Sequence, residues 1–207
     1  VEFLLDRERN FYFLEVNARL QVEHPVTELV TGVDLVHQQI SIASGQKLTF
    51  RQEDLRQHGQ AIECRIYAED PKNNFLPSSG KILFFQEPKG PGVRHDCGIY
   101  CGWEVPIYYD PILAKLIVWA ENRDLACQRM AAALNDYILL GINTSIAFLK
   151  DVIGHPEFRA GRTTTAFIKK HLDGWRDQDK NEETLNLALA ASAFDSLQGA
   201  GASRGKS

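Results

Sequence analysis

Residues 15–23 carry the side chains whose types and spacing are best suited to chemistry. They read Glu-Val-Asn-Ala-Arg-Leu-Gln-Val-Glu, with a polar group at every odd position and an apolar one at every even position. In an extended chain successive side chains point to opposite faces and rise by about 3.3 Å per residue. The pattern therefore predicts a strand that presents one polar row, made of Glu15, Asn17, Arg19, Gln21 and Glu23. Such a row could hold a cation, an anion and a proton acceptor at fixed separations.

The same alternation is typical of any half-solvated antiparallel strand, and on the pattern alone that interpretation is the commoner one. Two neighbouring segments favour the functional alternative. The apolar run 11–14 suggests a well-buried strand. The strand-like run 1–5 and the polar turn 6–10 predict a β-hairpin with it.

The hairpin would supply a second carboxylate. If Asp6 pairs with Phe11, Glu2 lies directly opposite Glu15, and like charges at such positions are destabilising. A cation between them, or a proton on one of them, would relieve the repulsion. With Asn17 the set is all oxygen, which suits Mg²⁺ or Mn²⁺ holding a phosphorylated ligand.

Length and composition narrow the class of protein. The chain has 207 residues, 44% of them hydrophobic, which is enough for one sizeable core or one plus part of another. The net charge of −4 argues against a nucleic-acid surface. No stretch approaches the roughly 20 apolar residues that span a bilayer, and the N-terminus lacks a signal-peptide pattern.

The cysteines Cys64, Cys97, Cys101 and Cys127 are too few and too scattered for a disulfide framework. His95, Cys97 and Cys101 could be three zinc ligands, but no fourth stands out nearby. We therefore favour reduced thiols in a reducing compartment over a zinc site.

The remaining pattern alternates strands and helices. A helix is predicted at 35–44, with Asp34 as its N-cap and Gly45 as its stop. Short strands are predicted within 55–86 and 93–119. Two further helices are predicted at 124–137 and 145–153, the first with apolar residues at helical spacing: Leu125, Met130, Ala133, Leu134 and Tyr137. Residues 174–183 are interpreted as a linker, 184–197 as a helical stretch and 199–207 as a disordered tail.

Several motifs resemble one family. Residues 13–20 are similar to the second signature of the ATP-grasp ligases that include biotin carboxylase and carbamoyl-phosphate synthetase. The continuation 20–28 is more selective and resembles the biotin carboxylase branch. Further matches to that branch follow in order, at 59–66, 68–71, 75–82 and 108–117. The resemblance covers about residues 1–172.

The resemblance implies roles for individual residues. Glu2, Glu15 and Asn17 would coordinate one or two Mg²⁺ or Mn²⁺ ions on the phosphates of ATP, and Leu4 would touch the nucleotide base. Other residues would handle bicarbonate and biotin: Arg19, Gln21 and the backbone of Val22 would hold bicarbonate, Glu23 would be its general base, and Arg65 would stabilise the enolate-like ureido ring of biotin.

Each role has a plainer alternative. Glu63 and Arg65 share one face of an alternating run and could be a surface ion pair worth about 0–1 kcal/mol. His24 precedes Pro25, so an extended conformation at the end of the strand is expected, and we interpret His24 as structural rather than as the base. Lys115, inside the apolar run 112–119, is interpreted as a snorkelling or paired lysine.

The implied fold is α+β: the C-terminal part of an ATP-grasp domain at 1–54, the biotin carboxylase C-terminal domain (an antiparallel sheet with helices) at 55–172, and a linker with one helical stretch at 173–207. Implied partners are a biotin carboxyl carrier domain or protein, a carboxyltransferase subunit and a second copy of the chain. The expected place is the cytoplasm, or the mitochondrial matrix in a eukaryote.

The chain opens on Val1 inside a strand, so we expect a fragment of a longer ATP-dependent ligase, such as the α-subunit of an acyl-CoA carboxylase. Two alternatives remain. A carbamoyl-phosphate synthetase type of ligase fits the run 21–28 and Arg65 less well, and a non-catalytic dimerisation module would have no need of the site residues.

Overall fold

The computed structural model describes residues 1–176, which form a mixed helix and sheet fold in which every strand pair is antiparallel. The first half contains β1 (Glu2–Leu5), β2 (Phe11–Glu15), α1 (His24–Thr31), α2 (Leu35–Ala43), β3 (Gln60–Tyr67), β4 (Glu69–Asp70), β5 (Leu76–Pro77), β6 (Gly80–Lys81), β7 (Phe84–Gln86) and β8 (Val93–Cys97). The second half contains β9 (Glu104–Val105), β10 (Ile112–Ala120), α3 (Arg123–Asp136), β11 (Ile138–Leu140), α4 (Ile146–Gly154), α5 (Pro156–Arg159) and α6 (Phe167–His171).

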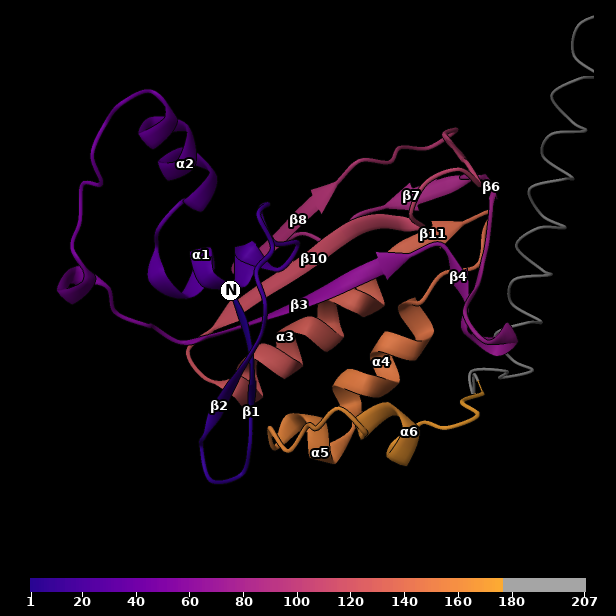
Figure 1. The fold of residues 1–207 in the computed structure, drawn as a ribbon. Helices are drawn as coiled ribbons and strands as arrows, with labels where there is room; N and C mark the ends of the chain where they lie inside the picture. The colour runs from indigo at the N-terminus through magenta and orange to yellow at the C-terminus, as the bar shows by residue number, and fades with distance from the viewer. Residues whose placement is uncertain (177–207) are drawn as a thin grey trace, which may run out of the picture.

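The central element is the sheet β3-β10-β8, with β10 in the middle. Helix α3 packs on one face of it, and α1 contacts β3 and β10. Figure 1 shows α3 and α4 below the sheet, and α1 with α2 at the left-hand end of the sheet. The core on the α3 side includes the fully buried Ile66, Leu116, Met130 and Leu134. An α+β fold with an antiparallel sheet, as expected, is therefore confirmed.

The predicted helices are also present, and local capping explains their starts. The Asp34 carboxylate accepts the backbone N–H of His37 at 2.7 Å and begins α2. The Asn122 side chain accepts the N–H of Leu125 at 3.0 Å and begins α3. Leu125, which the apolar spacing places on the buried face of α3, is exposed, whereas the adjacent Ala126 and Cys127 are buried. The stretch 184–197 and most of 173–207 lie outside the described residues.

The hairpin β1-β2 forms, but with a different register. Leu5 pairs with Phe11 and Phe3 with Phe13, so the expected pairing of Asp6 with Phe11 is wrong. The cause is the turn, where the Asp6 carboxylate accepts the Asn10 backbone N–H at 2.8 Å and its side-chain amide at 2.9 Å.

An irregularity between Glu2 and Phe3 then shifts the register, and Glu2 lies opposite Glu15 after all. The predicted pairing of the two carboxylates is therefore confirmed, although it arises by another route.

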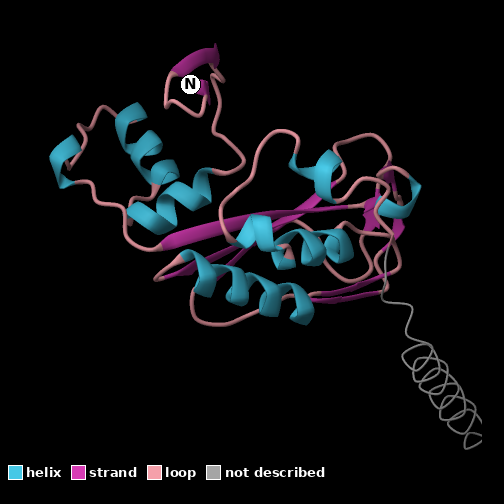
Figure 2. Ribbon diagram, turned by 90° about the horizontal axis from the view of Figure 1, so that it is seen from below, coloured by secondary structure: helices cyan, strands magenta, loops and turns pink. Residues whose placement is uncertain are grey.

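The polar row is not a strand. Strand β2 ends at Glu15, and α1 begins at His24 with Pro25 in its first turn, so the extended conformation expected of His24 is wrong. All five residues of β2 are exposed, contrary to the expected burial, because no described element packs over the hairpin. Figure 2 shows the hairpin standing apart from the sheet. Among residues 1–176 no helix has the length and apolar character needed to cross a bilayer.

Candidate functional site

The three predicted metal ligands lie together at the open end of the hairpin. The Asn17 side-chain amide donates to Glu2 Oε1 at 2.8 Å and to Glu15 Oε1 at 3.1 Å. Two carboxylates thus converge on one donor, as the cross-strand pairing requires. Leu4, the residue expected to touch a nucleotide base, lies on β1 of the same hairpin and is half exposed.

Gln21 joins this group to the predicted anion site. Its Nε2 donates to Glu2 Oε1 at 2.8 Å, and its Oε1 accepts from Arg19 Nη1 at 3.2 Å. Residues 16–23 therefore bring their polar side chains together through turns rather than through the pleat of a strand. Of the side chains that the alternation singled out, Glu15 and Asn17 are bonded to each other, and so are Arg19 and Gln21, although the predicted conformation was wrong.

The predicted base and the predicted biotin ligand form an ion pair. Glu23, which stands just ahead of α1, accepts a hydrogen bond on Oε2 from Arg65 Nη2 at 2.7 Å. Both side chains stay partly exposed, at 52% for Glu23 and 41% for Arg65. The alternative pairing of Arg65 with Glu63 on the protein surface is wrong, because Glu63 lies beneath α1 with both carboxyl oxygens buried and, among residues 1–176, without a hydrogen-bond partner.

The face of the sheet under α1 is charged, and sheet register explains why. Lys115 on β10 is the cross-strand partner of Arg65 on β3 and of Asp96 on β8. One step along, Ile117 pairs with Glu63 and with Arg94. Cross-strand partners point to the same side, so these residues form one layer. We call this layer the charged face, made of Glu63, Arg65, Arg94, Asp96 and Lys115.

Each strand of the charged face is bonded through one side chain to residues 22–28, the segment that covers this face. On β3, Arg65 binds Glu23. On β10, Lys115 Nζ donates to the Val22 carbonyl oxygen at 3.2 Å. On β8, Arg94 Nη1 donates to Glu28 Oε2 at 2.6 Å. The backbone at the predicted anion site is thereby fixed to the most buried part of the molecule.

Sequence reasoning missed Arg94, Glu28 and the target of Lys115. The sequence indicated a role for Lys115 only through its position as a lone lysine inside the apolar run 112–119. The interpretation of Lys115 as a paired lysine is confirmed by its contact with Asp96 at 3.2 Å. Glu28 is 8% exposed and also accepts the Leu35 N–H at 2.7 Å, which ties α1 to the start of α2.

The electrostatics of the charged face keep Asp96 ionised. Partial burial alone would raise the pKa of the Asp96 carboxyl, but hydrogen bonds from Arg94 and Lys115 hold it below its ordinary value. His24 has a structural contact, as interpreted, because its Nδ1 lies 2.8 Å from the Gln21 carbonyl oxygen. A cavity of about 420 Å³ opens beside these groups, lined by Gln21, Val22, His24, Asp96 and Lys115 among others.

The alternative zinc ligands do not converge. His95 contacts Glu87 at 3.2 Å and the Tyr137 hydroxyl at 3.1 Å, and Cys101 Sγ lies against the Leu83 carbonyl. Within the described part of the chain no three His, Cys, Asp or Glu side chains form a group that could hold a metal. Burial raises the pKa of the Cys64 thiol to about 12, which keeps it an unreactive thiol.

Comparison with known families matches both parts of this architecture. The model described as "Biotin carboxylase C-terminal domain" matches residues 63–170, and "Carbamoyl-phosphate synthase L chain, ATP binding domain" matches residues 1–51.

Two known carboxylase proteins are similar in sequence to this chain. The mitochondrial propionyl-CoA carboxylase alpha chain of Homo sapiens is 47% identical over 96% of this chain, and the biotin carboxylase of Halalkalibacterium halodurans is 54% identical over 83%. This chain spans only 28% and 38% of their lengths.

A solved structure shares the fold. It is the biotin carboxylase domain dimer of Hydrogenobacter thermophilus 2-oxoglutarate carboxylase, in complex with MgADP, ADP and bicarbonate. It superposes with a TM-score of 0.82 at 45% identity, covering 84% of this chain and 38% of that one. Since the first family model matches more than half of the sequence, the chain belongs to the biotin carboxylase C-terminal domain family and carries ahead of that domain part of an ATP-binding domain.

Proposed function

We propose that this chain forms the metal-holding and bicarbonate-activating part of an ATP-dependent biotin carboxylase, within an acyl-CoA carboxylase of the acetyl, propionyl or methylcrotonyl type. One observation carries the proposal. Gln21 bonds at one end to the carboxylate of Glu2 and at the other to Arg19, so a cation site and an anion site share one side chain. An enzyme that brings bicarbonate to the phosphates of a metal-bound nucleotide needs that adjacency.

The donor set fits a hard divalent cation. Glu2 and Glu15 place carboxylate oxygens on either side of the Asn17 amide, and oxygen ligands are those that Mg²⁺ and Mn²⁺ prefer. With a cation present, the amide would turn its oxygen rather than its nitrogen toward the shared point. One or two bound ions would neutralise the phosphate charge of ATP, and Leu4 would contact the base of the nucleotide.

The anion site would take bicarbonate. Arginine offers a planar fork that matches a planar oxyanion, so Arg19 would bind it together with Gln21 and the Val22 backbone. Lys115, held at the Val22 carbonyl, keeps this backbone in place. The 420 Å³ cavity beside the segment leaves room for a small anion.

Glu23 would remove the bicarbonate proton, and a positioned base contributes typically 10²–10⁴-fold. The bicarbonate oxygen would then attack the γ-phosphorus of ATP, which gives carboxyphosphate and ADP. Carboxyphosphate would break down to CO₂ and phosphate, the phosphate would take the N1 proton of biotin, and the resulting ureido anion would attack CO₂. Arg65, one hydrogen bond from Glu23, would exchange that partner for the ureido oxygen and stabilise its developing charge.

Domain limits and partners complete the proposal. Residues 1–54 would end the ATP-grasp domain, and 55–172 would form the C-terminal domain. Biotin would arrive on a carrier domain or protein, and a carboxyltransferase would use the product. A second copy of the chain would bind through the C-terminal domain, since the domain in the matched 2-oxoglutarate carboxylase structure is described as a dimer. The cytoplasm or the mitochondrial matrix would be the place of action.

Bicarbonate-dependent and biotin-dependent ATP cleavage by the complete enzyme tests the proposal. Glu23→Gln should lower the rate by about 10²–10⁴-fold because it removes the base. Arg65→Ala should abolish biotin carboxylation. Glu104→Gln, an exposed carboxyl on β9, is the matched control and should leave the rate unchanged. Full activity of Glu23→Gln would remove its assigned role, and cleavage that ignores biotin would favour a carbamoyl-phosphate synthetase type of ligase.

A further inference from the structure

Glu63 is a carboxyl that the proposed reaction does not use and the fold does not satisfy. It lies on β3, opposite Ile117 of β10, on the side of the sheet that α1 covers. Both of its carboxyl oxygens are buried, and within the described residues neither has a hydrogen-bond partner. Buried polar groups almost always have partners, so a buried acid without one needs an explanation.

The cations of the charged face are already occupied. Each is paired with another carboxylate: Arg65 with Glu23 at 2.7 Å, Lys115 with Asp96 at 3.2 Å, and Arg94 with Glu28 at 2.6 Å. Three positive charges thus meet three negative ones before Glu63 is counted. A charged Glu63 would add an unmatched negative charge in a place where water cannot reach its oxygens.

The proton affinity of Glu63 fits this position. Burial raises the pKa of its carboxyl to about 7, against the opposing effect of Lys115 and Arg65, while Glu23 and Asp96 raise it further. The other ionisable groups on the covering element, His24 and Glu28, are engaged with the Gln21 carbonyl and with Arg94. Glu63 is therefore the group in this layer whose charge changes near neutral pH.

The neighbours of Glu63 are the residues proposed to do the chemistry. Arg65 is two residues further along β3 on the same face, and Arg65 holds Glu23. We propose that Glu63 is a positioning residue of the bicarbonate site. While Glu63 is a neutral acid, Arg65 has Glu23 as its anionic partner. Once Glu63 is a carboxylate, it becomes a second anionic neighbour of Arg65 and makes Glu23 a stronger proton acceptor. This inference rests on the roles proposed above for Glu23 and Arg65.

Two consequences follow from like-charge coupling. A negative charge beside Glu23 disfavours a second negative charge there, so Glu23 holds a proton taken from bicarbonate more firmly. The same charge competes with Glu23 for the guanidinium of Arg65, which weakens the Arg65–Glu23 pair. Both effects appear only when Glu63 has lost its proton.

The first test is the pH dependence of kcat/KM for bicarbonate in the complete enzyme, with the concentration of bicarbonate itself held constant at each pH. The wild type and the control Glu104→Gln should gain activity as pH rises through about 7. Glu63→Gln should lose this rise. Its kcat/KM should be about tenfold lower at pH 8 and unchanged at pH 6, as expected if the charge of Glu63 changes the proton affinity of Glu23 by about a factor of ten. A variant that keeps the rise, or that is slower by the same factor at every pH, would overturn the proposal.

The second test needs no turnover and no variant that folds poorly. Infrared difference spectra of the full chain, recorded along a pH series, should show a protonated-carboxyl band that disappears near pH 7. The band should be missing from Glu63→Gln and present in Glu104→Gln. Absence of the band from the wild type would overturn this inference alone. Its presence together with full activity of Glu23→Gln would overturn the proposed function and the positioning role with it.

Discussion

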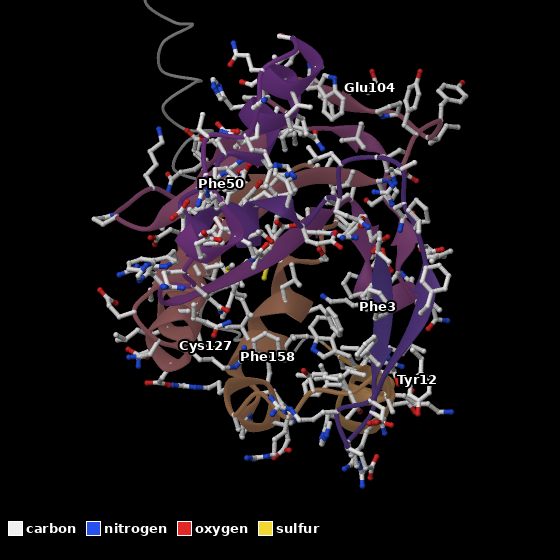
Figure 3. The ribbon with its side chains drawn as sticks, turned by 60° about the vertical axis from the view of Figure 1, so that its left-hand side comes forward. Phe3, Tyr12, Phe50, Glu104, Cys127 and Phe158 are labelled. Carbon is white, nitrogen blue, oxygen red and sulfur yellow. The ribbon has the colours of Figure 1, made fainter. Side chains whose placement is uncertain are left out.

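The hairpin β1-β2 and the sheet β3-β10-β8 both supply residues of the proposed site, yet they are held in opposite ways. Phe3 and Phe13 of the hairpin are 51% and 64% exposed, whereas Ile66 and Leu116 of the sheet are fully buried. Figure 3 shows Phe3 and Tyr12 on the hairpin, well away from Cys127 and Phe158 at the helices beneath the sheet. The hairpin is shaped by local polar contacts, and the sheet by its core.

This difference assigns different tasks to the two regions. The Asp6 turn and an irregular pairing set the register of the hairpin, so Glu2 and Glu15 depend on a locally stabilised element. The segment proposed to bind bicarbonate is instead tied to three strands through Arg65, Lys115 and Arg94. It is thus held by the buried sheet as well as by the bond from Gln21 to Glu2 of the hairpin.

The largest expected effect is in the sheet. Leu116→Ala should lower the free energy of unfolding by about 2–5 kcal/mol, since it leaves a cavity in a fully packed core. The midpoint of urea unfolding, with an unchanged m-value, measures it. A loss well below 1 kcal/mol would show that the sheet does not carry the stability of the chain.

The tie at β10 should matter for binding rather than for folding. Lys115→Met removes a cation and the hydrogen bond to the Val22 carbonyl, so the KM for bicarbonate should rise about tenfold, equivalent to about 1.4 kcal/mol, with a smaller change in kcat. Lys89→Met, at an exposed lysine paired with Glu87, is the control. An unchanged KM would separate the charged face from the anion site.

The effect of Glu63→Gln on stability should grow as pH rises. The pKa of Glu63 is raised in the folded state from 4.5 to about 7, so its contribution is fully present below pH 4.5 and is lost as pH rises through about 7. The variant lacks this loss and should exceed the wild type by about 1 kcal/mol at pH 8, after allowance for solvent screening. Thermal unfolding from pH 4 to pH 8 measures it, and a difference independent of pH would contradict the assignment.

The smallest effect is expected in the hairpin. Phe13→Ala removes an exposed ring that meets Phe3 edge-on at 6.2 Å, and should lower the free energy of unfolding by less than about 1 kcal/mol. The same urea experiment as for Leu116→Ala applies. A cost equal to that of Leu116→Ala would place the hairpin within the cooperative core and remove the contrast drawn above.

Local rules predicted the helices because local contacts create them. The Asp34 cap and the apolar spacing of α3 act within one or two turns, and both are visible in the sequence. The strand predicted for the polar row 15–23 ends at Glu15 for the converse reason. Alternation describes a pleat only where a neighbouring strand supplies hydrogen bonds, and no described strand pairs with residues 16–23.

By itself the sequence determined which side chains could do chemistry, where helices begin and which family the chain resembles, because residue type, spacing and caps act over short distances. Only the tertiary structure decided that Arg65 binds Glu23, that Lys115 holds the Val22 carbonyl and that, within residues 1–176, Glu63 has no hydrogen-bond partner. Those outcomes depend on the register of β3, β10 and β8 and on α1 lying over them. Register is set by the packing of a whole face, which no short stretch of sequence contains.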